Sequence, residues 1–192
     1  MTNLTRFITV QFFYNWFYEH LQKLCLQLPS NYTGIKLAKI HPATQSINLA
    51  TSNNRVLQIE IFNTMHVFIV LRGFVLESIT ARGLDEHVFN ESGDIDPFTS
   101  SKHIVFRSVT NAATSAIQYY MYAINTGSID TTLKTMLAWL RSYKNLFTEK
   151  CKKCFQLLDS ECMVPTWRDT KNLSAYHESC RKSKILHNTL HP

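Results

Sequence analysis

The sequence predicts an α+β fold: an N-terminal helix, an antiparallel sheet, two amphipathic helices and a zinc-binding C-terminal tail. Apolar residues recur every three or four positions near the N-terminus and again after residue 99, which is the period of an amphipathic helix. Between these stretches, residues 35–82 contain short β-branched runs separated by turn-like breaks, which is typical of an antiparallel meander. Cysteines and a histidine at metal-ligand spacing follow residue 150.

Residues 1–30 are predicted to form an aromatic-rich helix that ends at Pro29. Aromatic side chains occupy more than one face of this helix, so we expect it to pack on a core and on a neighbouring chain. Its candidate partner-surface residues are Phe12, Trp16 and Phe17. No small-x-small cleavage motif follows, and no apolar stretch reaches the roughly 18–20 residues that a bilayer span needs. Neither a signal peptide nor a membrane partner is therefore predicted.

Residues 31–147 are predicted to form one α+β domain, which begins with the sheet. Its strands are expected at 35–40, 56–61, 67–71 and 74–79. The continuous apolar run 67–71 favours a central strand that is covered on both faces. Residues 90–94 have the composition of a turn between short strands at 86–89 and 94–96.

Two amphipathic helices complete this domain. Asp96-Pro97 ends the sheet region, and a Ser or Thr at 99–101 can cap the first helix. Gly127 separates it from the second helix, which Asp130 can cap. The apolar stripe predicted for the second helix comprises Leu133, Met136, Leu137, Leu140, Tyr143 and Phe147.

The C-terminal module, residues 148–183, carries the pattern Cys151-x2-Cys154 and, after 22 residues, His177-x2-Cys180. A two-residue spacing lets two side chains converge on one point from a tight turn or from one turn of a helix. Three thiolates and one imidazole match the tetrahedral preference of Zn2+ and leave no open position. The four residues therefore predict a structural zinc site, which would hold the module in place and perform no chemistry on a substrate.

Two expectations concern the end of the chain. Residues 173–183 can form a single helix, on which His177 and Cys180 would share a face. Residues 184–192 are expected to be a disordered tail.

Three residues between the two ligand pairs leave alternatives open. Cys162 could replace His177 in a four-cysteine set, but it has no cysteine at two-residue spacing and is interpreted as a bystander. Trp167 could stack on nucleotide bases, although packing beside the metal site is the favoured interpretation. Arg168 is expected to support the site by pairing with a carboxylate or a carbonyl.

The charge distribution and the number of cysteines limit the classes of function that are possible. The net charge is +6, and residues 141–192 contain ten Lys/Arg against five Asp/Glu. A basic end can dock on nucleic acid or on an acidic protein face, although a solvated surface is the plainer interpretation. Nucleic-acid binding by a zinc-containing module is the alternative function. Five cysteines, an odd number with four late in the chain, favour metal ligation in a reducing compartment over a disulfide framework.

The sequence does not carry the motifs of several enzyme classes. A zinc deaminase needs His-x-Glu before its cysteine pair, whereas here the histidine follows the cysteines. We find no His-Glu-x2-His, no Gly-x-Ser-x-Gly and no phosphate-binding glycine loop in a chain with only five glycines. These observations predict an interaction module with no small-molecule substrate.

The order of motifs in the C-terminal half resembles the Mediator complex subunit 27 family. The resemblance covers about residues 65–181. The order and spacing of all the motifs together are more specific for the family than the cysteines alone. Its motifs are Val88-Phe89, Gly93-Asp94-Ile95-Asp96, Val105-Phe106, Thr110-Asn111-Ala112-Ala113-Thr114, Trp139-Leu140-Arg141-Ser142-Tyr143, Leu146-Phe147, Cys151-x2-Cys154, Pro165-Thr166-Trp167-Arg168-Asp169 and Tyr176-His177-x2-Cys180-Arg181.

The resemblance implies a nuclear, non-catalytic subunit of the Mediator coactivator, which bridges transcription activators and RNA polymerase II. It implies other Mediator subunits as direct partners, activators as indirect ones, and no direct binding of nucleic acid. Members of the family carry a longer N-terminal helical region, whereas residues 1–30 do not resemble it. Cys162 falls in a variable spacer of the family, which supports its interpretation as a bystander.

Overall fold

The computed structural model describes residues 35–42, 54–61, 63–72, 75–91, 93–123 and 129–181. The predicted helix at 1–30, with Phe12, Trp16 and Phe17, and the predicted tail at 184–192 lie outside the described residues. None of the helices in the described part of the chain combines the length and apolar character needed to cross a membrane.

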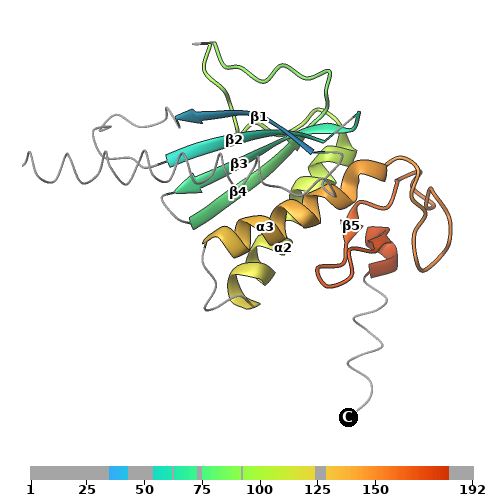
Figure 1. Ribbon diagram of the computed structural model, residues 1–192. Coiled ribbons are helices and arrows are strands. Elements are labelled where there is room, and N and C mark those ends of the chain that lie inside the picture. The colour runs from blue at the N-terminus through green and yellow to red at the C-terminus, as the bar shows by residue number, and fades with distance from the viewer. Residues whose placement is uncertain are drawn as a thin grey trace, which may run out of the picture. The chain divides into compact units, whose positions relative to one another are not determined.

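Four antiparallel strands form a meander in chain order, as the sequence predicts (Figure 1). They are β1 (Ile35–Pro42), β2 (Asn54–Ile61), β3 (Met65–Arg72) and β4 (Val75–Arg82). In the register of the sheet, Ile69 of β3 lies opposite Leu57 on one side and Ile79 on the other. The five residues 67–71 are all buried, which confirms that β3 is covered on both faces.

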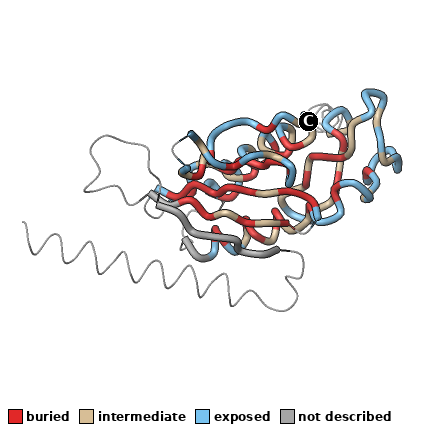
Figure 2. The backbone as a smooth tube through the Cα atoms, turned by 90° about the horizontal axis from the view of Figure 1, so that it is seen from above, coloured by how far each residue is buried: buried red, intermediate tan, exposed pale blue. Residues whose placement is uncertain are grey.

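The two faces of the sheet are covered by different parts of the chain. Helices α2 (Ile104–Ala123) and α3 (Ile129–Arg141) lie on one face, and the segment between β4 and α2 runs along the other (Figure 1). That segment contributes Val88 and Ile95 to a second cluster of buried side chains with Val56, Phe68 and Val70 of the sheet. Figure 2 shows how the buried stretches gather along the strands and the layers that cover them.

A buried arginine secures the segment between β4 and α2. Arg82, at the end of β4, donates hydrogen bonds from Nε to the carbonyl of Thr99 at 2.8 Å and from Nη1 to that of His87 at 3.3 Å. Its guanidinium also lies 5.4 Å from the ring centroid of Phe68. The two short strands predicted within the segment are reduced to one antiparallel bridge, between Phe89 and Ile95.

The second predicted helix ends earlier than its apolar stripe indicates. After Arg141 the chain tightens into a 3-10 turn, η2 (Ser142–Asn145). Side chains three residues apart point the same way in a 3-10 turn, and Tyr143 and Leu146 are accordingly both buried. Phe147, which a continuous α-helix would have turned inward, is 46% exposed and meets Phe106 edge-on at 6.2 Å between centroids.

Candidate metal centre

The first two candidate ligands lie on a tight turn that follows η2 after a short irregular stretch. The amide of Lys153 points at Cys151 Sγ at 3.4 Å, and the amide of Phe155 donates to the carbonyl of Cys151 at 2.9 Å. Phe155 closes the turn in the left-handed region, with a φ of 60°. This geometry turns backbone N–H groups towards sulfur and leaves Cys151 and Cys154 free to face a common point.

The other two ligands follow a short strand pair. β5 (Trp167–Arg168) and β6 (Ala175–Tyr176) are antiparallel, and His177 is the next residue. The expected helix over 173–183 is wrong, because the chain is extended through β6 and becomes helical only at 178–181. The carbonyl of His177 accepts a hydrogen bond from the Arg181 amide at 3.1 Å, so His177 stands at the entrance of this turn and Cys180 within it.

A backbone hydrogen bond holds the two halves of the site together. The amide of Lys152, between the first two cysteines, donates to the carbonyl of Ala175 in β6 at 2.9 Å. The ligand atoms of Cys151, Cys154, His177 and Cys180 consequently all lie within 4.8 Å of one another. Four such atoms arranged tetrahedrally around a zinc ion, at bond lengths of about 2.0–2.3 Å, would be separated by roughly 3.5–3.8 Å, so the ligand atoms would have to close in by about 1 Å at most. The arrangement therefore fits a four-coordinate ion without large rearrangement.

The tautomer of His177 suits a metal ligand. Its Nε2 lies 3.2 Å from the carbonyl oxygen of Leu157, which can only accept a hydrogen bond. Nε2 therefore carries the proton, and Nδ1 presents its lone pair 3.3 Å from Cys154 Sγ. Histidine ligands in proteins are commonly oriented in this way, by a carbonyl on the ring nitrogen that does not bind the metal.

The thiols differ in their electrostatic surroundings. Burial raises the pKa of Cys151, but hydrogen bonds from the amides of Cys154 and Lys153 outweigh it and lower that pKa to about 6. Burial raises the pKa of Cys180 to about 11, and the neighbouring Cys151 and Cys154 act in the same direction. Three thiolates this close repel one another unless a cation lies between them, so this donor set suits a divalent metal ion.

Three side chains of the helices hold the module through its backbone. Tyr120 of α2 donates from its hydroxyl to the carbonyl of Thr170 at 2.7 Å. Tyr143 does the same to Thr166 at 2.8 Å, and Trp139 Nε1 donates to the carbonyl of Arg168 at 3.3 Å. We predicted Tyr143 as part of an apolar stripe and named Trp139 only within a family motif, so this second role was missed. Its signal in the sequence was their polar tips, since a buried Tyr or Trp needs a hydrogen-bond partner.

Arg168 and Trp167 occupy opposite sides of β5. Arg168 is 0% exposed, donates from Nη1 to the carbonyl of Pro165 at 2.8 Å and lies 3.4 Å from a carboxylate oxygen of Glu149. Pairing with a carboxylate or a carbonyl was expected, and both are present, although Glu149 was not foreseen. Trp167 is half-buried against Tyr176, with the guanidinium of Arg181 5.1 Å from its ring centroid.

Comparison with known proteins agrees with the motif order. The family model of Mediator complex subunit 27 matches residues 95–181. A Xenopus laevis protein named Mediator of RNA polymerase II transcription subunit 27-B is 28% identical over 166 residues, which are 84% of this chain and 52% of that protein. Subunit 27 of Danio rerio is 30% identical over the same shares of both chains, and that of Aedes aegypti is 34% identical over 67% of this chain and 42% of its own length.

The chain belongs to the Mediator complex subunit 27 family. It spans about half the length of the curated relatives it matches. The family match at 95–181 includes all four candidate ligands as well as Arg168 and the helices that hold it.

Cys162 stands apart from the candidate ligands of this family member. It is exposed, it has a φ of 57°, and its amide donates to the carbonyl of Asp159 at 3.0 Å in a turn of its own. Among the described residues, the cluster of potential ligand atoms contains the other three C-terminal cysteines and His177 without it.

A second group of potential ligands lies at the start of α2 and is already engaged. Asp85 pairs with Lys102 at 2.8 Å and with Nε2 of His103 at 3.1 Å. Glu86 accepts hydrogen bonds from the amides of Gly83 and Lys102 and from the Ser101 hydroxyl. These contacts fix the chain before α2, and they explain the acidic residues without a metal ion.

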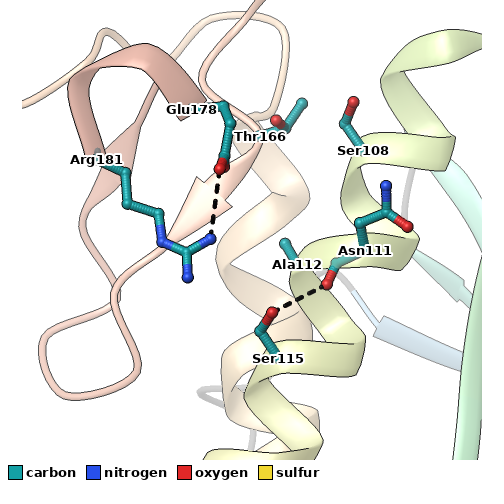
Figure 3. Close-up of a pocket in the computed structure, with 7 residues that line it drawn as sticks. All are labelled: Ser108, Asn111, Ala112, Ser115, Thr166, Glu178 and Arg181. Atoms are coloured by element: carbon teal, nitrogen blue, oxygen red, sulfur yellow. Dashed lines mark hydrogen bonds and ion pairs between the residues drawn. The ribbon is translucent and has the colours of Figure 1, made fainter. Parts of the chain in front are cut away.

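A pocket of about 220 Å3 lies where α2 meets the turn that carries Cys180 (Figure 3). It is lined by Ser108, Asn111, Ala112, Ser115, Thr166, Glu178 and Arg181. Figure 3 shows Glu178 and Arg181 paired with each other, at 3.5 Å. None of the four candidate ligands lines the pocket, so the candidate metal centre does not open into it.

Proposed function

We propose that this chain is a non-catalytic subunit of the Mediator coactivator complex and acts as a protein–protein interaction module in the nucleus. In this role it links transcription activators to RNA polymerase II through contacts with other Mediator subunits. Membership of the subunit 27 family supports the proposal, as do relatives named as subunits of Mediator of RNA polymerase II transcription.

The proposed function includes a structural zinc ion bound by Cys151, Cys154, His177 and Cys180. The observation that carries it is the convergence of four ligand atoms within 4.8 Å of one another. The bound ion supplies a cross-link between the turn at 151–155 and the turn at 178–181, with no position left for a substrate. Trp167 and Arg168 support the site by packing and pairing around β5.

The metal site and the contacts of the module with the helices can together provide a rigid surface on which another protein docks. The metal would hold the two turns to each other, while Tyr120, Trp139 and Tyr143 hold the module to the helices. Binding free energies of structural zinc sites, about 10–16 kcal/mol in small zinc fingers, are large enough to order a segment with little core of its own.

The alternative, direct binding of nucleic acid by the basic end, has less support. Among the eight Lys and Arg residues in the described part of this end, Arg168 is buried against Glu149 and Arg181 lies on Trp167, whereas Lys150 and Lys152 are exposed. Arg181 thereby covers one face of the Trp167 ring, whereas an aromatic ring on which a base stacks needs an open face. If nucleic acid were the partner, affinity would fall steeply with added salt, with a slope set by the number of phosphates contacted.

Co-purification tests the proposed function. A tagged copy of the chain is expressed in cells, recovered from nuclear extract and washed in high salt. Several Mediator subunits should co-purify with it in amounts close to that of the tagged chain. The matched control is the same chain with Tyr143→Asp, which places a carboxylate at a buried position against the C-terminal module. Recovery of the tagged chain without any Mediator subunit would count decisively against the proposal.

A further inference from the structure

Phe155 combines two unfavourable features. Its φ of 60° lies in the left-handed region, where a bulky side chain is strained and glycine is favoured. Its side chain is also 70% exposed, so burial does not compensate for the strain. A strained residue that persists without a packing role is a reason to look for a function at that position.

The exposed residues that lie close to Phe155 in the sequence include an apolar one and two positively charged ones. Leu158, three residues later, is 49% exposed, and Lys150 and Lys152 are exposed just before Phe155. No ion pair engages either lysine among the residues that the structure describes. We name Lys150, Lys152, Phe155 and Leu158 the knuckle patch.

The two carboxylates nearest to the knuckle patch in sequence are already engaged. Glu149 lies against the guanidinium of buried Arg168 at 3.4 Å. One oxygen of Asp159 accepts hydrogen bonds from two backbone amides, those of Glu161 and Met163, each at 3.0 Å. Glu149 therefore has its charge matched by Arg168, while Asp159 keeps its negative charge but is held in a turn of its own backbone, so that Lys150 and Lys152 remain the cations available to a partner.

We propose that the knuckle patch docks on another protein subunit, at an apolar recess that receives Phe155 and is bordered by Asp or Glu carboxylates. The proposal rests on the proposed function as a complex subunit. Aromatic residues, Phe included, are enriched in contacts between proteins, whose rim is polar, and positive lysines favour an acidic rim on the partner.

The composition of the patch favours a protein partner over nucleic acid. Both would offer negative charge to Lys150 and Lys152, and an aromatic ring can stack on a base. Leu158, however, has no flat face for stacking, whereas an apolar recess in a protein can bury it together with Phe155. The backbone of the turn holds Phe155 in position, because its amide donates a hydrogen bond to the carbonyl of Cys151.

Zero-length cross-linking of the assembled complex tests the proposal. The complex is purified through the tagged full chain and treated with a carbodiimide, which joins lysine amines to carboxylates in direct contact. Mass spectrometry should find Lys150 or Lys152 joined to Asp or Glu of another subunit. Phe155→Gly should reduce these cross-links about tenfold, because truncation of an anchor residue weakens a contact by that order.

Stability of the free chain separates docking from a structural role. Phe155→Gly should leave the thermal midpoint of the isolated chain unchanged or higher, because glycine relieves the left-handed strain. Tyr122→Ala is the matched control: it removes an aromatic ring that is 86% exposed on α2, outside the patch, and should leave the lysine cross-links unchanged.

Three results would overturn the proposal. The first is that Lys150 and Lys152 join only carboxylates of this chain, or that ultraviolet light cross-links the patch to nucleic acid instead. The second is a lower thermal midpoint for Phe155→Gly, which would make Phe155 a structural residue. The third is recovery of the chain without Mediator subunits, which overturns this proposal and the proposed function together; the first two leave the proposed function intact.

Discussion

The guanidinium of Arg168 lies over the ring of Tyr143, 4.7 Å from its centroid. Both side chains are fully buried, and they join the C-terminal module to the 3-10 turn after α3. Glu149 approaches the same guanidinium, so a cation, a ring and a carboxylate meet at one point between the helices and the strand pair. This contact makes the position of the module depend on the helices as well as on its own ligands.

Arg168→Ala should lower the free energy of unfolding by about 2–4 kcal/mol. The substitution removes the cation–π contact and the packing of a fully buried side chain, and it leaves the partly exposed Glu149 without its partner. Urea unfolding of the purified chain measures the change. Arg181→Ala, at a half-buried guanidinium on Trp167, should cost less than about 1 kcal/mol. Equal losses for the two variants would contradict a special role for Arg168.

Tyr143→Phe should lower the free energy of unfolding by about 1–2 kcal/mol, because the buried carbonyl of Thr166 loses its hydrogen-bond donor while the ring remains. Tyr122→Phe is the matched control, since that hydroxyl belongs to an exposed side chain on α2. Thermal unfolding of both variants provides the measurement. An unchanged midpoint for Tyr143→Phe would show that water replaces the lost bond.

The purified chain should contain about one zinc ion per molecule. Cys154→Ser should abolish stoichiometric binding, because the site loses a thiolate, whereas Cys162→Ser should retain it. Elemental analysis after gel filtration distinguishes the two. Loss of zinc in both variants would mean that Cys162 joins the ligand set and that the assignment of His177 needs revision.

Removal of metal should unfold the C-terminal module locally. After treatment with a chelator, we expect amide hydrogen exchange to accelerate at Lys152, Phe155 and Arg181, whose amides donate within the site. Amides of β2 and β3 should remain protected, because these strands pair with their neighbours far from the ligands in sequence. Uniform exchange throughout the chain would indicate that the metal supports the whole domain.

Asp96 should contribute stability that disappears in acid. Burial raises its pKa, but hydrogen bonds from Thr99 and Phe98 and the charge of Arg82 together lower it below the usual value. A carboxyl whose pKa is lowered on folding stabilises the native state above its unfolded pKa of about 3.9, and this stability is lost as the pH falls through the folded value. The difference in urea stability between the unmodified chain and Asp96→Asn should therefore shrink below about pH 4. A constant difference between pH 2 and 6 would refute this.

Much of the fold was accessible from the sequence because it depends on local patterns. The four strands were predicted from alternation and turn residues, and each is found with its ends within three residues of the predicted bounds. The bounds of the second helix were less accessible. It begins at Ile129, so Asp130, which was predicted to cap it, lies inside it. Its apolar stripe continues to Phe147, but the chain changes to a 3-10 turn after Arg141, where packing of Tyr143 and Leu146 prevails over helical period.

The four candidate ligands could be predicted from the sequence alone, since two Cys/His pairs at two-residue spacing are typical of a metal site. Only the tertiary structure decided how the pairs meet. The amide of Lys152 donates a hydrogen bond to the carbonyl of Ala175 in β6, and the carbonyl of Leu157 selects the tautomer of His177. It also decided that Arg168 pairs with Glu149 and that the tyrosine hydroxyls reach carbonyls of the module. These contacts join residues many positions apart, and no periodicity along the chain records which distant groups will satisfy a buried charge or carbonyl.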